Sequence, residues 1–517
     1  MVVSLLRVIY TGLQDERLLP PKGKPAFQFF TKVFIKAGRF TTAWVRLDFD
    51  TRPNFGTQAS ITLPRQGHLI TRLYLVTTMP DIVGPQLLAR ASVSPGSQFA
   101  GPTFGWTNSL GHALITDATI DIGGARVEQI NGQLMEMLDE FNTPLEKVTT
   151  VNSLLPRIQD GFNPQSIGWE PRPTVAVTPL PFWFSRGDPG VVLPIDAIGV
   201  DQVRLNITFA PLASLYVSSA QVDISGIAQP AAGSAYYPLL NSPFYQTGVA
   251  PQAKPVFGLN GNPTQSQLVS KIGTITMPPS YALGDTYLLA EYVYLDKPEA
   301  NKFRISDIQY PIPQHYIFEP ADTNGLSRIQ VPLRIPNPTR DLFFYCQRIE
   351  AQAYNAPFLA SRDLSGLGVT VAPWWPNATG LNPVNLGFLQ AGFWNRESEP
   401  LNSMALVYEG KLYRFNSQSP SVYRSLLPSY EQKKSPWINR YYYNMTFGTQ
   451  HVLYPWSIPS GEANLDKIEK IELRLEFRPF RGSMDPNNVP RYRILCFAET
   501  YNILRIYGGK AGLLFQF

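Results

Sequence analysis

Short segments in which apolar and polar residues alternate, bounded by Pro or Gly, recur along the chain. A period of two residues places every second side chain on the same face of a strand, so these segments predict half-buried β-strands. Strands of this length and spacing are typical of a β-sandwich or a β-barrel. The clearest segments are Phe30–Ile35, Ile61–Leu63, Ile70–Val76, Ala118–Ile122, Arg204–Phe209, Leu288–Tyr294, Arg328–Leu333, Lys470–Phe477 and Ile503–Tyr507.

Features of the first half recur in the second half in the same order. They are two consecutive strand-like segments, a strand that leads into a glycine turn, and a later strand that starts with Arg-Leu and ends at Pro. Several weak matches in one order carry more weight than any single match, and they predict two tandem β-sandwiches of similar topology. The pairs are Ile61–Pro64 with Ile329–Pro332, Leu73–Leu75 with Leu342–Phe344, Ile120–Arg126 with Leu406–Leu412, and Arg204–Pro211 with Arg474–Pro479.

Helical signals are few, and the best is Asn131–Phe141. Its apolar residues recur at intervals of three and four, which places them on one face of a helix. Asp139 and Glu140 are expected on its solvated face. The apolar face comprises Leu134, Met137, Leu138 and Phe141.

Long stretches rich in Pro, Gly and Ser predict loops or insertions at 81–106, 152–178, 216–268 and 355–400. Loops of this length in a compact chain are usually functional. In a β-sandwich they gather at the ends of the sheets.

Composition excludes several classes of protein. Of the 517 residues, 12% are aromatic and only 16% are charged, so the chain can bury large cores and is not expected to be disordered as a whole. The low charged fraction suggests that partners cover part of the surface. The net charge of +5 is spread without any run of five like charges, so direct nucleic-acid binding is not expected. Neither a transmembrane helix nor a signal peptide is expected, because no apolar window of 18 residues and no cleavage pattern occur.

The residues show no pattern for metal or nucleotide chemistry. HExxH, CxxC and a complete P-loop are absent, so no metal and no other cofactor is expected. Asp48 and Asp50 imitate the start of a calcium loop, but Arg52 stands at the third ligand position, so we expect a solvated or salt-bridged pair. The four histidines are separated by more than forty residues and are expected to be ordinary core or surface residues. They are His68, His112, His315 and His451.

Two further residue types allow local predictions. Cys346 and Cys496 lie in apolar segments and are predicted to be reduced core thiols rather than a disulfide. Of three Asn-x-Ser/Thr sequons, those at Asn206 and Asn444 fall in strand-like segments. Asn377, in a loop, is therefore the single candidate glycosylation site, with an unmodified Asn as the alternative.

Five stretches resemble, in order, conserved blocks of the major capsid proteins of nucleocytoplasmic large DNA viruses, the iridovirus-like and algal-virus-like group. The most similar block has a Leu-Pro-Phe-Trp-Phe strand, an Arg-x-x-x-Gly turn, a Leu-Pro strand and a final alternating strand. In the first block, His68 stands where the family commonly has Asp. The stretches are Asn54–Pro80, Trp106–Val127, Leu180–Phe209, Ala290–Arg304 and Tyr501–Gly512.

The resemblance implies an all-β fold of two tandem eight-stranded antiparallel jelly rolls, with long loop insertions and a few short helices. We expect an N-terminal arm at residues 1–24 and the first jelly roll at 25–215. A linker or insertion is expected at 216–270 and the second jelly roll at 271–517. The arm is expected to contact a neighbouring capsomer, a minor capsid protein or an internal membrane.

The resemblance also implies a function by self-assembly, without enzyme activity. The chain would form a homotrimer whose six jelly rolls make a pseudo-hexagonal capsomer of an icosahedral shell. Its partners would be neighbouring capsomers, penton and minor capsid proteins, and internal membrane-associated proteins. Its place would be the virion shell, assembled in the host cytoplasm. The aromatic clusters Trp374–Pro376 and Tyr441–Tyr443 would either interlock neighbours or pack within one subunit.

Three alternatives stay open at this stage. A scaffolding protein of virion assembly would share the double jelly roll and be absent from mature particles. A carbohydrate-active β-sandwich enzyme would need two carboxylates converging in a cleft. A lectin-like module would be a free-standing monomer or dimer that sugar stabilises.

Overall fold

The computed structural model describes residues 39–81, 104–157, 174–218, 281–349, 357–358, 360, 362, 399–417, 419–436, 440–448, 461–479 and 485–515. The expected strand Phe30–Ile35, the arm at 1–24, His451, Asn377 and Trp374–Pro376 lie outside these residues, as do most of the expected loops. Within the described part, no helix is long and apolar enough to cross a membrane.

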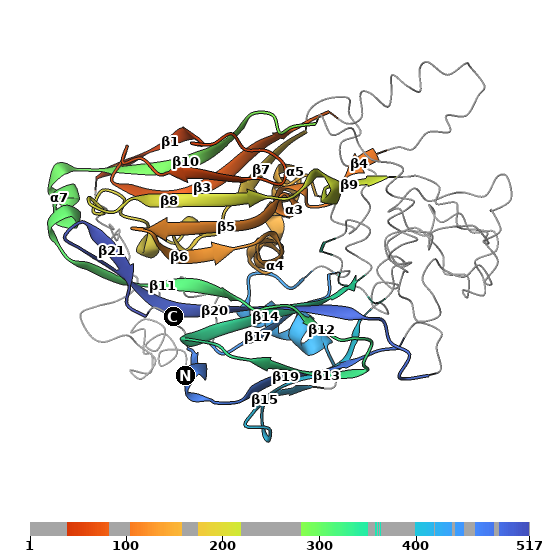
Figure 1. The fold of residues 1–517 in the computed structure, drawn as a ribbon. Helices are drawn as coiled ribbons and strands as arrows, with labels where there is room; N and C mark the ends of the chain where they lie inside the picture. The colour runs from red at the N-terminus through yellow and green to blue at the C-terminus, as the bar shows by residue number, and fades with distance from the viewer. Residues whose placement is uncertain are drawn as a thin grey trace, which may run out of the picture. The chain divides into compact units, whose positions relative to one another are not determined.

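Eight strands form the first sandwich as two four-stranded antiparallel sheets (Figure 1). Their alternating segments put the apolar face inward, as β8 shows with every second residue from Val203 to Phe209 buried. One sheet has the order β1 (Phe40–Asp48), β10 (Thr286–Leu295), β3 (Leu69–Met79) and β7 (Thr174–Pro179). The other has the order β2 (Gln58–Thr62), β8 (Val203–Phe209), β5 (Ile115–Ile122) and β6 (Ala125–Ile130).

The second sandwich is built in the same way. One sheet has the order β11 (Ile308–Ile317), β20 (Tyr492–Tyr507), β14 (Pro338–Arg348) and β17 (Tyr442–Thr446). The facing sheet has the order β13 (Arg328–Leu333), β19 (Ile471–Phe477), β15 (Leu401–Tyr408) and β16 (Leu412–Ser417). Short additional strands are β12 (Ala321–Asp322), β18 (Ala463–Asn464) and β21 (Lys510–Leu513), and β4 (Phe104–Trp106) pairs with β9 (Tyr216–Ser218).

Both sandwiches have the same connectivity. When the eight main strands of each are numbered along the chain, one sheet has the order 1-8-3-6 and the other 2-7-4-5. This is the order of a jelly roll, in which the last strand lies between the first and third strands of one sheet. The fold is therefore two tandem eight-stranded antiparallel jelly rolls, as the sequence predicts.

The internal repeat in the sequence joins strands that occupy equivalent places in the two jelly rolls. The matched segments lie on β2 and β13, on β3 and β14, and on β8 and β19. The glycine-turn pair connects β5 to β6 and β15 to β16, and each turn contains two consecutive residues with positive φ. Such a conformation favours glycine, which explains why a glycine, Gly124 in one turn and Gly410 in the other, stands at the same place in both halves of the repeat.

The expected boundary between the jelly rolls at residue 271 is wrong. Strand β10 lies after that boundary, yet it pairs with β3 of the first sandwich from Thr286–Thr77 to Val293–Leu69. The last strand of a jelly roll fills the centre of its first sheet, so the first sandwich is incomplete without Thr286–Leu295. The alternating pattern marks this segment as a strand but carries no information about which sheet receives it.

Helices are short, and α4 is the longest of those described. It spans Gly132–Asn142, and the Asn131 side chain caps it by accepting a hydrogen bond of 2.8 Å from the Leu134 N–H. The others are α3 (Leu110–Ala113), α5 (Val148–Leu154), α7 (Lys297–Ile305), α10 (Leu427–Glu431), the π-helical turn η9 (Val422–Leu426), and the 3₁₀ turns η2 (Leu145–Lys147), η4 (Trp183–Ser185), η5 (Pro189–Val191), η6 (Leu212–Ser214) and η10 (Leu465–Lys467).

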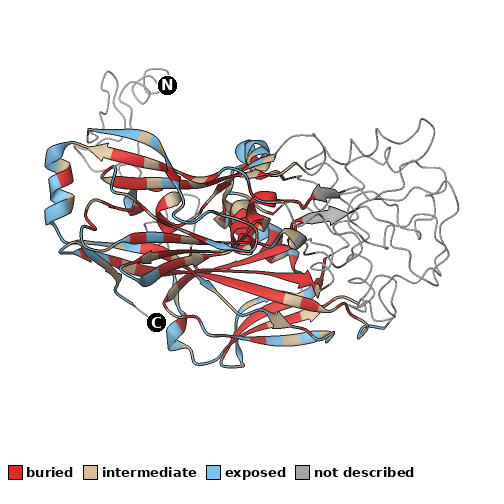
Figure 2. Ribbon diagram, turned by 45° about the horizontal axis from the view of Figure 1, so that its top comes forward, coloured by how far each residue is buried: buried red, intermediate tan, exposed pale blue. Residues whose placement is uncertain are grey.

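The sheet that contains β14 and β20 is buried on both faces (Figure 2). One face packs on the core of its own sandwich, where Phe344 stacks on Tyr443 at 5.1 Å between ring centroids. The other face packs against the first sandwich, where Phe343 meets Phe141 of α4 at 5.4 Å. Tyr441–Tyr443 are buried within the subunit, so this cluster packs locally instead of interlocking neighbours.

Cys346 and Cys496 lie in the second core as free, buried thiols, as predicted. Burial raises the pKa of the Cys496 thiol to about 12 and raises that of Cys346 well above its usual value. Because the thiolate is the reactive form, we expect both cysteines to be inert toward Ellman's reagent in the native protein and reactive after unfolding in guanidinium. Rapid labelling of the native protein at pH 8 would contradict this assignment.

Candidate functional site

Helix α4 lies between the two sandwiches and packs closely on α3 (Figure 1). Its first residue, Gly132, faces the backbone carbonyls of His112 and Ile115 so closely that a Cβ atom would overlap both oxygens. This is a contact with backbone, which cannot rotate away as a side chain can. The glycine therefore sets how near the start of α4 comes to the first sandwich.

We expect Gly132→Ala to lower the free energy of unfolding by at least about 1–3 kcal/mol, the usual cost of overpacking. Gly199→Ala is the matched control, because a Cβ there has nothing within 4 Å. Chemical denaturation of both variants measures the difference. Equal stability of Gly132→Ala and the wild type would show that α4 does not sit where the structure places it.

Three carboxylates of α4 face cations rather than solvent, so the expected solvated face is wrong. Glu136 is fully buried and Glu140 is 4% exposed. Glu140 Oε1 lies 3.1 Å from Lys434 Nζ, and Asp139 accepts a hydrogen bond from Arg157. The helical periodicity gives the spacing of these acids correctly, but their partners come from distant parts of the chain.

Glu136 is the centre of this cluster. Its Oε2 lies 2.7 Å from His112 Nδ1 and accepts a bond of 3.3 Å from Arg157. Its Oε1 accepts a bond of 3.0 Å from Ser109 Oγ and lies 3.1 Å from Arg440. Burial alone would raise the pKa of this carboxyl, but Arg157, Arg440 and His112 outweigh burial and hold the pKa well below its usual range.

A second buried cluster joins the sandwiches around His315 of β11. His315 Nδ1 lies 2.9 Å from Glu128 Oε1 of β6, and Glu128 Oε2 accepts a hydrogen bond of 2.9 Å from the backbone N–H of Trp183. Arg186 of the first sandwich donates to Glu499 of β20 at 3.2 Å and also bonds to His315. Arg186, His315 and Arg340 outweigh the effect of burial and hold the pKa of Glu499 well below its usual range.

The two clusters are reciprocal. Glu136, Glu140 and Glu128 of the first sandwich each meet a cationic or imidazole group of the second. Conversely, Glu499 of the second sandwich meets Arg186 of the first. Pairs of this kind hold a fixed geometry because a shift would leave buried charges without partners. We call the contact between the two sandwiches, with the cluster around Glu136 and the cluster around His315, the junction. The junction thus fixes the orientation of one jelly roll relative to the other.

The remaining candidate residues do not converge on a chemical site. His68 accepts a hydrogen bond of 2.8 Å from the Leu295 N–H, and Asp48 is salt-bridged to Arg46 at 2.8 Å, as expected. The sequons Asn206 and Asn444 lie in β8 and β17, also as expected. Across the described residues, no group of His, Cys, Asp and Glu has the arrangement of a metal site.

Sequence reasoning missed both charged clusters. His112 and His315 are buried, as the prediction of core or surface histidines allows, but the sequence does not indicate that each lies against a buried carboxylate. The available signal was a single charged residue within an apolar segment, such as Glu499 in the strand-like segment that follows Cys496. Such a residue predicts a buried partner but does not identify it.

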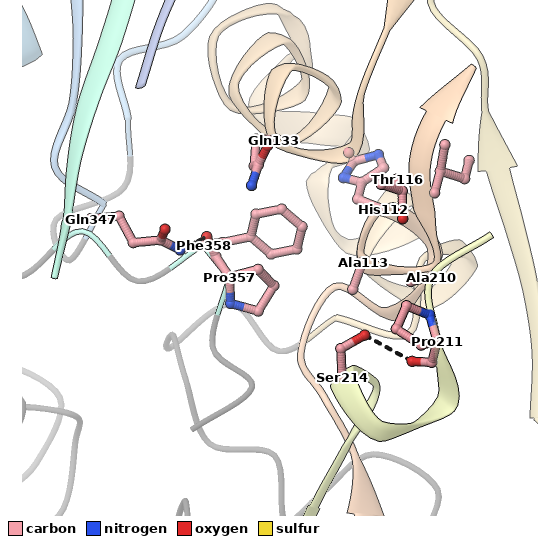
Figure 3. A pocket seen from close by; sticks show the side chains of 12 residues that line it. His112, Ala113, Thr116, Gln133, Ala210, Pro211, Ser214, Gln347, Pro357 and Phe358 are labelled. Carbon is pink, nitrogen blue, oxygen red and sulfur yellow. Dashed lines mark hydrogen bonds between the residues drawn. The ribbon is translucent and has the colours of Figure 1, made fainter. Parts of the chain in front are cut away.

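A cavity of about 310 Å³ opens at the junction, lined by residues of both sandwiches (Figure 3). His112, Thr116 and Gln133 come from the first, and Gln347 and Phe358 come from the second. No Asp or Glu is among the lining residues, so the cavity offers no carboxylate pair for the glycoside-hydrolase alternative.

Comparison with protein families identifies the family to which this chain belongs. Residues 28–242 match the model of the major capsid protein N-terminus, and residues 302–512 match that of the large eukaryotic DNA virus major capsid protein. The chain belongs to this family of viral major capsid proteins. The iridovirus-like and algal-virus-like resemblance in the sequence is thereby confirmed.

Individual members of this capsid family are similar along the whole chain. The chain is 22% identical to "Probable capsid protein 4" of Acanthamoeba polyphaga mimivirus over 100% of its own length and 99% of that protein. It is 24% identical to the major capsid protein of Wiseana iridescent virus over 94% of its length and 88% of that protein. Among solved structures, a capsid protein chain in the quasi-atomic model of the PBCV-1 virus capsid superposes with a TM-score of 0.64 at 16% identity, covering 95% of this chain and 100% of that one.

Proposed function

We propose that this major capsid protein acts by forming a homotrimer that serves as one pseudo-hexagonal capsomer of an icosahedral shell. The observation that carries the proposal is the identical connectivity of the two jelly rolls within one chain. Three copies related by a three-fold axis then present six similar sandwiches, which approximates six-fold packing with only three-fold symmetry.

The reciprocal clusters at the junction supply the rigidity that such a capsomer needs. Six sandwiches tile evenly only if the two sandwiches of each chain keep one relative orientation. Hydrophobic contact is non-directional and tolerates sliding, whereas the Glu136–Arg440 and Arg186–Glu499 pairs are directional. We therefore assign the junction the role of setting the angle within the capsomer.

Exposed apolar side chains on the second sandwich are candidates for contacts between copies. Tyr430 of α10 is 71% exposed and Leu412 at the start of β16 is 65% exposed.

The proposal extends to neighbouring capsomers, penton and minor capsid proteins and internal membrane-associated proteins as partners, and to assembly in the host cytoplasm. It includes self-assembly without catalysis. Residues 1–24 as a contact arm and Asn377 as a glycan acceptor stay predictions.

Electron cryomicroscopy of the purified protein tests this function. We expect class averages with a hexagonal outline that refine with three-fold symmetry and hold six jelly rolls. Single double-jelly-roll particles at micromolar concentration would overturn it. Proteomics of purified virions adds the distinction from a scaffold, because a capsid subunit must be abundant in mature particles and a scaffold must be absent from them.

A further inference from the structure

The junction covers the outer face of one sheet of the second sandwich. Phe343 of β14 lies on that face beside its cross-strand neighbour Phe497 of β20, and both side chains are buried. Phe141 of α4 packs on Phe343 at 5.4 Å between ring centroids, and β6 meets β11 of the same sheet through the Glu128–His315 pair. The first sandwich therefore covers this face with its edge strand β6 and with the helix α4 that follows that strand.

The equivalent face of the first sandwich points away from the second sandwich (Figure 1). The strand register identifies it, because Tyr74 of β3 pairs with Leu289 of β10 at the place where the two phenylalanines pair in the second sandwich. Both side chains are only partly buried. Trp44 of β1 lies 5.6 Å from Tyr74 between ring centroids and is 46% exposed, and Val175 of β7 is 51% exposed. We call this exposed apolar surface, formed by Trp44, Tyr74, Leu289 and Val175, the Trp44 face.

The second sandwich carries counterparts of β6 and α4. Strand β16 is the edge strand in the position of β6, and its ladder with β15 has a bulge after two residue pairs from the glycine turn, as the ladder of β6 with β5 has. The helical turns η9 and α10 follow β16 as α4 follows β6. Large apolar side chains of β16 and of these helical turns are exposed. They are Leu412 (65%), Tyr413 (51%), Leu426 (50%) and Tyr430 (71%), which together we call the Tyr430 edge.

Within one chain, the edge of the first sandwich meets the face of the second, which leaves the Trp44 face and the Tyr430 edge exposed. A second copy offers the surface that fits each of them, because the equivalent pair of surfaces already fits inside the chain. We propose that the Tyr430 edge of one copy packs on the Trp44 face of a second copy, as α4 and β6 pack on the second sandwich within one chain.

Burial of these apolar and aromatic side chains drives the contact. The two partners use different surfaces, so the contact is heterologous and can close into a ring. In that ring each sandwich meets its neighbours in the same way, whether the neighbour belongs to the same copy or to the next one. The inference rests on the proposed homotrimer and names the surfaces through which its copies meet.

Photo-cross-linking of the full-length protein identifies the surface that the Tyr430 edge meets. Replacing Tyr430 with the photo-reactive p-benzoylphenylalanine changes a side chain that is 71% exposed, so the fold should be kept. In a mixture of unlabelled and ¹⁵N-labelled protein, we expect cross-links between copies from position 430 to peptides of β1, β3, β7 or β10. A trimer without cross-links to these strands would contradict this inference but not the proposed function, whereas a monomeric wild type would contradict both.

Substitutions on either surface provide an independent test. Trp44→Glu and Tyr430→Glu each place a charge in the contact and should raise the concentration at which the trimer dissociates by at least about tenfold, measured by native mass spectrometry over a dilution series. Ile305→Glu is the matched control, because Ile305 is 83% exposed at the end of α7 and belongs to neither surface. Val175→Glu repeats the test of the Trp44 face if Trp44→Glu does not fold. A folded variant of either surface that dissociates like the wild type and the control would overturn the pairing.

Discussion

Replacing Glu136 with Gln should lower the free energy of unfolding by about 3–5 kcal/mol, the cost of leaving buried cations without their partner. Glu136 is fully buried and contacts both Arg157 and Arg440, which belong to different sandwiches. Neutralising it removes the attraction that offsets the desolvation of two guanidinium groups. Guanidinium denaturation, followed by intrinsic fluorescence, measures the loss.

Asp285→Asn is the matched control for this substitution. Asp285 forms a shorter ion pair, 2.7 Å from Arg46, but both side chains are about half exposed. Water and salt screen such a pair, so its removal should leave the unfolding midpoint nearly unchanged. A Glu136→Gln variant as stable as Asp285→Asn would contradict the assignment of the junction to buried charge.

The pH dependence of the unfolding free energies of the wild type and of Glu136→Gln provides an internal check on Glu136. Its pKa is held below the ordinary value of 4.5 in the folded protein, so the unfolded chain binds a proton that the native chain does not. The stabilisation is therefore complete above about pH 4.5 and is lost as the pH falls below that value. The difference in unfolding free energy between the wild type and Glu136→Gln should shrink over the same interval, whereas a difference that persists unchanged in acid would have another cause.

Phe141→Ala should lower the free energy of unfolding by about 3–5 kcal/mol, the usual range for a large aromatic residue removed from a core. The ring is fully buried and packs on Phe343 across the junction. The backbone carbonyl of Phe141 also accepts a 3.0 Å hydrogen bond from the Lys434 N–H of the second sandwich. The truncation thus leaves a cavity where the two sandwiches meet.

Leu145→Ala provides the control for Phe141→Ala, because it lies just after α4 but is 63% exposed. Its unfolding midpoint should match that of the wild type. If Phe141→Ala lost less than about 1 kcal/mol, the junction would be too loosely packed to fix the orientation of the jelly rolls.

The sequence alone predicts the β-strands because, in a half-buried strand, every second side chain is apolar and faces the core. The alternating segments at β2, β8 and β19, the helix capped by Asn131 and the burial of both cysteines all follow from local patterns. The internal repeat predicts that the two sandwiches share one topology, since it places equivalent strands in the same order in both halves, whereas the jelly-roll connectivity is implied by the family resemblance. The local patterns and the repeat together predict two sandwiches, but they do not predict which residues of one sandwich contact the other.

The junction could not be predicted in this way, because its partners are brought together only by the fold. Glu136 and Arg440 are separated by 304 residues, and no periodicity links an acid on a helix to a base before a distant strand. The misplaced boundary at residue 271 has the same origin, because β10 pairs with β3, a strand that lies more than 200 residues earlier in the chain. Pairing between residues far apart in the chain depends on the three-dimensional arrangement of the sandwiches, and no short segment carries a pattern that predicts it.

The native mass of the purified protein tests the capsomer account most directly. The chain has a mass of 57.8 kDa, so a trimer should appear at about 173 kDa in native mass spectrometry or light scattering. We expect this species at micromolar concentration and in moderate salt. A stable monomer of 57.8 kDa under the same conditions would contradict it.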